Sequence, residues 1–578
     1  METYYIGLAN TFHDPAMAII DPAGKVVYAE ASERFLQYKR AIGCAADERE
    51  TVHRVLRDHC DPKARFVIAK PWSDKAHRFL EYLKLRGMTN HERLPMQSER
   101  MTKFLFGEHV LFSQGWLQYS SFQLSGGHLA DILRIAHDNK NVSYVRFPHH
   151  LTHAANGVFT SPFTEAVVMI VDGQGEGGSI TYFDYKNVKL REVHRVKGVQ
   201  SLGILYTVCT QMCGFDDEKG EEWKMMGLAS YGMLDEGILD DFRSLVQVDG
   251  MNIKYRSLRH VRDWFKRMQP RLRVPGSSPM QVADLAHTTQ YFYAEVMGKL
   301  LNRFHALGLS DNLVLGGGCA LNSSYNGQIL DQTPFRHLHI PCAPADDGNA
   351  LGAAFLAYQK ENPGADIRVS IQSPYLGSEI SAQSLQNLIK FGQIKKSRHL
   401  PGSVHQEAAR LLAEGKLLGW VQGRAEFGPR ALGNRSILAD PRPADMKDRI
   451  NSLVKFREEF RPFAPSILHE YGDEYFENYQ VTPYMDRTLT FRESARAKVP
   501  AVVHVDGTGR LQSVRREWNE RYYDLIQAFR ELTGIPMLLN TSFNIMGKPI
   551  MHSVEDAVAL FYTTGLDALV IGDYLFEK

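Results

Sequence analysis

The sequence predicts an α/β protein made of two domains, and three observations lead to this prediction. At 578 residues the chain is too long for one hydrophobic core. One pattern, an apolar strand followed by an acidic turn and a hairpin, occurs at residues 4–31 and again at 166–196. Past a proline- and glycine-containing stretch at 361–377, arginines spaced by glycine and proline begin. We therefore expect domains at 1–365 and 366–578.

The repeated pattern predicts a duplicated lobe. The first copy has strands at 4–9, 16–20 and 26–31, with a polar turn at 10–14. The second has strands at 166–171, 179–184 and 190–196. Two such copies are typical of the actin, sugar-kinase and Hsp70 ATPase architecture, in which nucleotide phosphates lie at the turns between the lobes. Two unrelated β-meanders are the alternative, because short strand patterns are ambiguous.

A histidine pair beside the second copy indicates a metal site. His149 and His153 are four residues apart, so on a helix both imidazoles share one face. Asp172 follows the strand at 166–171 and opens an Asp-Gly-Gln-Gly turn, whose glycines would admit a phosphate. Asp346 begins an alanine-rich helix and is a fitting fourth ligand. The alternative is a pair of histidines that merely caps a helix.

Three later stretches have the residue types of anion sites. Residues 316–318 are three glycines after an apolar strand. Residues 423–436 hold three arginines separated by glycine and proline, which favours guanidinium forks held for an anion. Residues 540–544 form a polar turn with small hydroxyls after a strand. A tight turn, a solvated charged face and a helix cap are the respective alternatives.

Composition limits the class of protein. The net charge of +1 argues against a nucleic-acid or polybasic membrane partner. No apolar run approaches the roughly 18 residues of a membrane span, and the N-terminus lacks the pattern of a signal peptide. Six scattered cysteines do not form a disulfide framework. We expect a cytoplasmic protein, and the oligomeric state stays open.

Together these motifs resemble the O-carbamoyltransferases of antibiotic and nodulation-factor biosynthesis, the tobramycin carbamoyltransferase and nodulation protein U type. The resemblance covers nearly the whole chain. Besides the histidine pair with its Asp-Gly-x-Gly turn, its motifs are Lys-Met-Met-Gly-Leu-Ala at 224–229, the arginine run at 423–436, Arg-Pro-Phe-Ala-Pro at 461–465 and Asn-Thr-Ser-Phe-Asn at 540–544.

The resemblance implies an actin-like first domain similar to threonylcarbamoyl transferase and a second domain similar to threonylcarbamoyl-AMP synthase. The second would make carbamoyl-AMP from carbamoyl phosphate and ATP, with Mg²⁺, and release pyrophosphate. The first would transfer the carbamoyl group to a hydroxyl of a small-molecule natural product. It would use Fe²⁺, or Mn²⁺ or Zn²⁺, bound by His149, His153, Asp172 and Asp346.

The resemblance also implies roles for further residues. His13 would be the general base toward the acceptor hydroxyl. The adenylate or nucleotide would be contacted by Lys39, Gly173, Gln174, Gly203, Gly318 and Asn322. Carbamoyl phosphate and ATP would be bound by Arg430, Lys455, Arg461, Arg510, Asn540 and Ser542.

Rival functions remain at this point. An actin-like small-molecule kinase with an accessory domain would produce ADP rather than AMP, and would need no second anion site. A non-catalytic ATP-dependent scaffold or tRNA-modification partner would need a basic groove, which is not evident. A zinc metalloprotease lacks the glutamate directly after the first histidine. The segment 233–280 does not match the family's acceptor-contacting part, so the acceptor alcohol stays unidentified.

Overall fold

The computed structural model describes residues 2–78, 81, 118–198, 200–365, 367, 372–392, 394 and 396–578. The chain divides into two compact units. The first comprises Met1–Glu33, Arg40–Leu321 and Ile329–Gln372, and the second comprises Arg34–Lys39, Asn322–Gln328 and Ser373–Lys578. The expected boundary at 365/366 falls beside undescribed residues. The separate tasks expected of the two domains stay a prediction.

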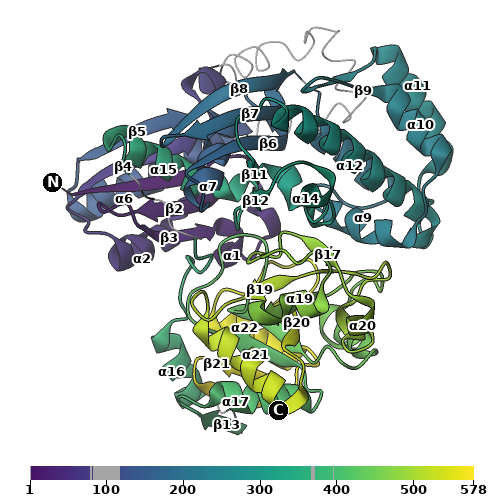
Figure 1. Ribbon diagram of the computed structural model, residues 1–578. Coiled ribbons are helices and arrows are strands. Elements are labelled where there is room, and N and C mark those ends of the chain that lie inside the picture. Colours follow the sequence, from purple (N-terminus) through teal and green to yellow (C-terminus); the bar gives the residue numbers. More distant parts are fainter. Residues whose placement is uncertain are drawn as a thin grey trace. The chain divides into compact units, whose positions relative to one another are not determined.

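The first unit contains two five-stranded sheets with the same topology (Figure 1). In each, three antiparallel strands are followed by two parallel ones. The first sheet has the order β3-β2-β1-β4-β5, from Val26–Ala31, Ala16–Ile20, Thr3–Ala9, Arg65–Pro71 and Val142–Phe147. The second has the order β8-β7-β6-β11-β12, from Lys189–Lys197, Gly178–Lys186, Glu165–Gly175, Asn312–Gly316 and His337–His339. This confirms the predicted α/β fold with duplicated, actin-like lobes.

Two helices lie against these sheets and against each other. α15 (Asn349–Glu361) packs on β1, β2 and β4, and α7 (His149–Phe159) packs on β6 and β11. The helices approach closely at Gly352, where a Cβ atom would lie 1.9 Å from the carbonyl oxygen of Thr152. Only glycine permits this approach. It brings the start of α15, with Asp346 just before it, against the histidines of α7.

The turn after Asp172 differs from the prediction. We expected the strand to end at Asp172, but β6 continues to Gly175, and the turn into β7 follows at Glu176 and Gly177. The pairing of β6 with β7 shifts register between Val171 and Gly175, so the strand is irregular there. Glycines weaken a strand and favour such bulges, because they have no side chain to pack. Asp172 therefore lies in a bulged strand rather than at the mouth of a turn.

The remaining elements of the first unit are mostly helical. None of the described helices combines the length and apolarity needed to cross a bilayer. A small antiparallel pair is formed by β9 (Val246–Asp249) and β10 (Asn252–Tyr255). The other helices are α1 (Ser32–Leu36, shared with the second unit), α2 (Arg49–His59), α6 (Gly127–His137), α8 (Leu202–Met212), α9 (Glu222–Leu228), α10 (Glu236–Leu245), α11 (Leu258–Met268), α12 (Ala283–His305) and α14 (Ile329–Gln332).

The second unit is built on a mixed eight-stranded sheet of order β13-β22-β21-β14-β15-β20-β16-β19. In that order the strands are Lys396–His399, Tyr574–Glu577, Ala568–Ile571, Leu418–Val421, Arg435–Ala439, Met537–Ser542, Ala464–Leu468 and Gln512–Val514. A separate pair is formed by β17 (Thr488–Thr490) and β18 (Thr508–Arg510). The helices are α13 (Ser323–Asn326), α16 (Ala382–Phe391), α17 (Val404–Ala413), α18 (Met446–Ile450), α19 (Gly472–Tyr475), α20 (Glu493–Arg496), α21 (Glu520–Thr533) and α22 (Val554–Thr563).

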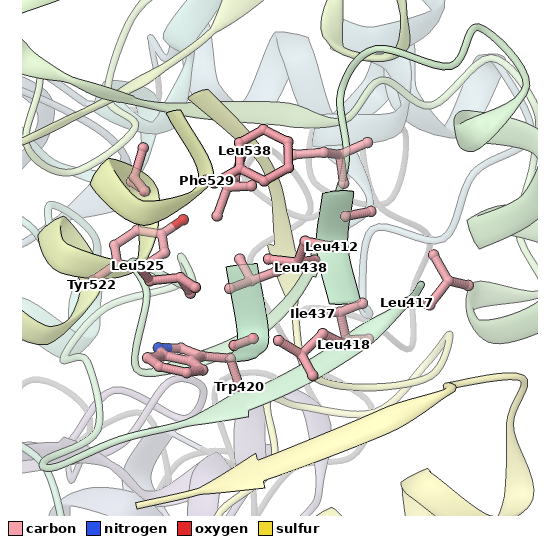
Figure 2. Packing of buried hydrophobic residues seen from close by; sticks show 14 of the residues in the cluster. Leu412, Leu417, Leu418, Trp420, Ile437, Leu438, Tyr522, Leu525, Phe529 and Leu538 are labelled. Atoms are coloured by element: carbon pink, nitrogen blue, oxygen red, sulfur yellow. The ribbon is translucent and has the colours of Figure 1, made fainter. Parts of the chain in front are cut away.

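The core of the second unit explains its central strands. β14 and β15 are buried along their whole length, and their hydrophobic residues do not alternate with exposed ones. The first two residues of β15, Arg435 and Ser436, are polar but buried as well. Figure 2 shows Trp420 of β14 and Leu438 of β15 among the apolar side chains of the helices, with Leu412 of α17 and Phe529 of α21.

Candidate functional site

The first unit brings four predicted metal ligands together. His149 Nε2 lies 3.2 Å from Asp172 Oδ2 and 3.4 Å from Asp346 Oδ1. His153 Nε2 lies 3.2 Å from Asp346 Oδ1 and 3.9 Å from Asp172 Oδ2. All four side chains are buried, and their ligand atoms lie within 4.8 Å of one another.

This geometry fits one divalent ion. Nitrogen and oxygen ligands that bind one ion at about 2.0–2.2 Å lie roughly 3–4 Å from each other in a tetrahedral arrangement. The four imidazole–carboxylate separations, from 3.2 to 3.9 Å, fall in this range. Two imidazoles with two carboxylates, and no thiolate, suit iron, manganese or zinc. The residues present therefore fit the metal that the sequence led us to expect, and the identity of the metal stays open.

The charges of the group also favour a cation. Burial acts to lower the pKa of His149, whereas Asp346 and Asp172 outweigh burial and raise it to about 10. Burial and Asp346 act to raise the pKa of Asp172, but the two imidazoles hold it at about 2. Without a metal, a protonated imidazole thus compensates two buried carboxylates. A divalent ion would replace that positive charge, and its binding would release protons.

Three predicted nucleotide-contact glycines surround Asp172. The Gly318 N–H donates to Asp172 Oδ1 at 3.1 Å. A Cβ atom on Gly203 would lie 3.1 Å from both Cα and N of Gly173, so α8 begins directly against the bulge of β6. A Cβ atom on Gly173 would meet nothing within 4 Å. The backbone beside the metal group is therefore open to an approaching ligand at Gly173.

The other predicted nucleotide residues have different surroundings. Gln174 is exposed, and its amide donates to the carbonyl oxygens of Gly175 and Gly198. Asn322 caps α13, because its Oδ1 accepts the Tyr325 N–H at 3.1 Å. Lys39 and Asn322 lie in two short segments, Arg34–Lys39 and Asn322–Gln328, that pack with the second unit. The structure thus groups Gly173, Gly203 and Gly318 with Asp172, whereas the contacts of Gln174 and Asn322 are to neighbouring backbone.

His13 lies beside the metal group and is held by its neighbour. Its Nδ1 is 2.9 Å from Asp14 Oδ2 and 3.8 Å from Asp346 Oδ2. Asp14 also accepts from Arg40 Nη2 at 3.2 Å, and the Asp14 N–H donates to the Arg40 carbonyl oxygen. Both Asp14 and Arg40 have left-handed backbones, with φ of 53° and 60°. The turn that contains His13 is therefore hydrogen-bonded to the segment around Arg40, and both have strained backbones.

A second charged group lies within the second unit and is positive. It consists of Arg430, Lys455, Arg457, Arg461 and Arg510, and we call it the cationic cluster. Burial lowers the pKa of Arg510 well below its usual value, and Arg430, Arg457 and Arg461 lower it further. Within the described residues no carboxylate pairs with Arg430, Lys455, Arg457 or Arg510. Mutual repulsion without matched acids is typical of an anion-binding site.

Arg457 was missed from the sequence, and the local backbone explains why. Residues two apart on an α-helix do not face the same side, so Lys455 and Arg457 looked unrelated. Here a π-helical turn at Asn451–Lys455 is followed by Phe456 with φ of 49°. The Arg457 guanidinium stacks 4.1 Å from the ring centre of Phe463 and donates to Asn451 Oδ1 at 2.8 Å. A π-turn has no reliable sequence signal, although such turns often mark functional sites.

Lys455 is bound by the turn at 542–544. Its ammonium donates to the Ser542 carbonyl oxygen, to Asn544 Oδ1 at 2.7 Å and to the Asn544 carbonyl oxygen at 3.0 Å. Ser542 Oγ lies 3.3 Å from the same ammonium. Asn540 is 1% exposed and donates to Ser466, Gln512 and the carbonyl oxygen of Ala431. Asn540 thus fixes the backbone next to Arg430 rather than facing an open site.

The structure corrects our interpretation of the arginine run at 423–436, in which the spacing of the three arginines favoured guanidinium forks held for an anion. Only Arg430 of its three arginines belongs to the cationic cluster. Arg435 is fully buried and donates to four backbone carbonyl groups, including Gln422 at 2.6 Å and Ser378 at 3.0 Å. Arg424 likewise donates to the Leu376 and Gly377 carbonyl groups. Most of this motif builds the loop, because a long irregular segment needs donors for its buried carbonyl groups.

We predict that anion binding at this cluster weakens as pH rises. Burial lowers the pKa of Lys455 well below that of an ordinary lysine, and Arg457 and Arg461 lower it further. The folded protein is therefore destabilised by the charged lysine, and its stability rises with pH between the folded and unfolded pKa values. Bound pyrophosphate favours the charged form of Lys455. The rise in unfolding temperature that pyrophosphate causes should therefore be largest near pH 7 and should become smaller toward pH 10.

An arginine keeps its charge to a higher pH than a lysine in the same surroundings, so Lys455→Arg should make the pyrophosphate-induced shift less dependent on pH. The same change at the more exposed Lys416 is the matched control and should leave the wild-type profile. Thermal unfolding with and without pyrophosphate measures both. Indistinguishable profiles for wild type and Lys455→Arg would contradict the assignment.

Comparisons with known proteins identify the family of the chain. Full-length HypF in its phosphate- and nucleotide-bound form is 12% identical, with a TM-score of 0.35, over 62% of this chain and 55% of that one. Nodulation protein NolNO of Sinorhizobium fredii is 38% identical over 82% of this chain and 69% of its own. Nodulation protein NolO of Bradyrhizobium diazoefficiens is 37% identical over 74% and 78%. The models for the carbamoyltransferase N-terminus and C-terminus match residues 5–355 and 409–578. The chain therefore belongs to the carbamoyltransferase family.

Proposed function

We propose that this carbamoyltransferase makes carbamoyl-AMP from carbamoyl phosphate and ATP in its second unit. Its first unit then transfers the carbamoyl group to a hydroxyl of a small-molecule acceptor. The observation that carries the proposal is the presence of two charged groups of opposite sign, one in each unit. The cationic cluster suits polyphosphate substrates. The imidazole–carboxylate group suits a metal ion.

The first half-reaction explains the cationic cluster. Carbamate is a poor electrophile until one of its oxygens becomes a good leaving group, and AMP provides one. Carbamoyl-AMP keeps a single phosphoryl group of ATP, so pyrophosphate leaves. The phosphoryl group of carbamoyl phosphate leaves as phosphate, and atom balance requires one water. Arg430, Arg461 and Arg510 neutralise the crowded phosphates, an interaction that gains strength where water is excluded.

The second half-reaction uses residues of the first unit. A metal held by the four ligands would supply positive charge to the phosphate of the departing AMP. Open space at Gly173 leaves room for that phosphate. Asp14 accepts from His13 Nδ1, which leaves Nε2 as the atom that takes the proton of the acceptor hydroxyl. The hydroxyl oxygen then attacks the carbamoyl carbon, and the bond to the AMP oxygen breaks.

The rival function is a small-molecule kinase, because the duplicated lobes of the first unit also occur in sugar kinases. The products distinguish the two. A kinase transfers the terminal phosphoryl group of ATP and yields ADP. The proposed reaction yields AMP and pyrophosphate, and only when carbamoyl phosphate is present.

We predict these products for the full-length, metal-loaded protein. Incubation with ATP, Mg²⁺ and carbamoyl phosphate should form pyrophosphate at a rate that falls to background when carbamoyl phosphate is omitted. Separation of the nucleotides and a pyrophosphate assay measure the outcome. ADP as the main nucleotide, formed independently of carbamoyl phosphate, would favour the kinase instead.

His13→Ala should slow carbamoyl transfer by about 10²-fold or more, the usual size of a general-base effect. Formation of carbamoyl-AMP and the bound metal content should both be kept, because His13 is not among the four ligands. Transfer is followed by mass spectrometry with an acceptor chosen from a panel of sugars and aminoglycosides. Added imidazole should restore part of the rate. A near-normal rate in His13→Ala would show that His13 is structural.

A further inference from the structure

Trp72, which directly follows β4, has an unusual backbone. Its φ of 72° lies in the left-handed region, where a bulky side chain is a true outlier. Such a conformation persists only when the surroundings impose it, and it often occurs where a side chain is held for function. No motif in the sequence singles out this residue. Its contacts show what it is held against.

The Trp72 ring covers the imidazole of His149. Their ring centres lie 4.3 Å apart with an angle of 30° between the planes. The indole N–H donates to Thr11 Oγ1 at 3.3 Å, and Phe122 lies 5.8 Å away, ring centre to ring centre. Thr11 belongs to the turn that also carries His13. Trp72 therefore connects the turn at 10–14 with His149, one of the four candidate ligands.

The carboxylate of Glu176 links the residue after Trp72 to the start of α7. Glu176, in the β6–β7 turn, accepts both the N–H and the hydroxyl of Ser73, the latter at 2.7 Å. The same carboxylate accepts the backbone N–H of His149 at 3.2 Å. Ser73 and the first residue of α7 are thus bound to the same group. The position of the Trp72 ring is consequently fixed relative to the start of α7.

The imidazole of His149 lacks the contact that normally orients a metal-bound histidine. A ligating histidine usually donates its second ring N–H to a carboxylate, a carbonyl group or water. His149 turns Nε2 toward the carboxylates, and its Nδ1 is buried without a hydrogen-bond partner among the described residues. Of the aromatic rings that contact this imidazole in the described residues, the indole of Trp72 lies nearest, at 4.3 Å, against 4.8 Å for His153 and 5.8 Å for His150. Together with the carboxylates at Nε2 it limits rotation of the His149 ring.

We propose that Trp72 is a positioning residue that orients His149 for metal binding by stacking, in place of the usual hydrogen bond. The inference rests on the metal role proposed for the four ligands. Removing the ring should weaken metal binding roughly 10–100-fold, the effect typical of groups that support a ligand. Replacing it with another aromatic ring should largely preserve binding.

The test is a Co²⁺ titration of the full-length protein after its metal has been removed, in competition with a chelator. Trp72→Gly removes the ring and also relieves the left-handed backbone, so the fold should be kept. Trp72→Phe keeps an aromatic face but loses the bond to Thr11, and Trp72→Leu keeps bulk without an aromatic face. The Co²⁺ visible absorption bands report the ligand geometry, and thermal unfolding reports the fold.

We expect weaker Co²⁺ binding and shifted bands in Trp72→Gly and Trp72→Leu, and near wild-type behaviour in Trp72→Phe. Wild-type affinity and bands in Trp72→Gly or Trp72→Leu would overturn the inference. So would equal losses in Trp72→Phe and Trp72→Gly, because stacking would then not be the orienting contact. Failure of the wild-type protein to bind Co²⁺ would be a different result and would overturn the proposed metal role itself.

Discussion

Burial of two carboxylates against two imidazoles is the constraint on which the first unit depends. Asp172 and Asp346 are each nearly inaccessible to solvent, and the negative charge of Asp346 acts to raise the pKa of Asp172. Such a pair is costly unless a cation compensates it. Two glycines bring these side chains together. Gly352 lets α15 cross α7 closely, and the Gly318 N–H donates a hydrogen bond to Asp172. The charge and the geometry of the group therefore fit a cation.

In its cationic cluster the second unit has an excess of positive charge, where the first unit has an excess of negative charge at its four candidate ligands. Its cationic cluster is assembled by a π-turn, a left-handed phenylalanine and a β-strand, each of which places a positive side chain among others of the same sign. Burial and the repulsion between like charges lower the pKa values of Lys455, Arg457 and Arg510, and they also lower stability. A bound polyphosphate would relieve this cost. In the proposed reaction the second unit would activate the carbamoyl group, and the first would transfer it.

The duplicated lobes and the four candidate metal ligands could be predicted from the sequence, because they follow regular strand or helix patterns. The two strand–turn–hairpin copies predicted the duplicated lobes, and the four-residue spacing of His149 and His153 predicted their shared helix face. Asp346 was predicted because an acidic residue preceded an alanine-rich helix. In each case a short local pattern determines which way a side chain points.

Residues whose direction depends on irregular backbone were not predicted. Arg457 joins its neighbours only through a π-turn, and Trp72 reaches His149 only through a left-handed backbone. The bulge that extends β6 to Gly175 shifted the expected turn. Arg424 and Arg435 looked like anion ligands by residue type, but the carbonyl groups of their own loop use them. The residue types in a motif indicate a possible chemistry. Whether a given side chain is available for it depends on which buried carbonyl groups of the same loop need its hydrogen bonds.

The division of the reaction between two sites is the central claim, and ATP–pyrophosphate exchange that depends on carbamoyl phosphate tests it most directly. In Arg461→Ala the exchange should be lost, because the cationic cluster is impaired. In His149→Ala the exchange should persist while no alcohol is carbamoylated. Equal loss of exchange in both variants would mean that both half-reactions share one site, and would contradict this account.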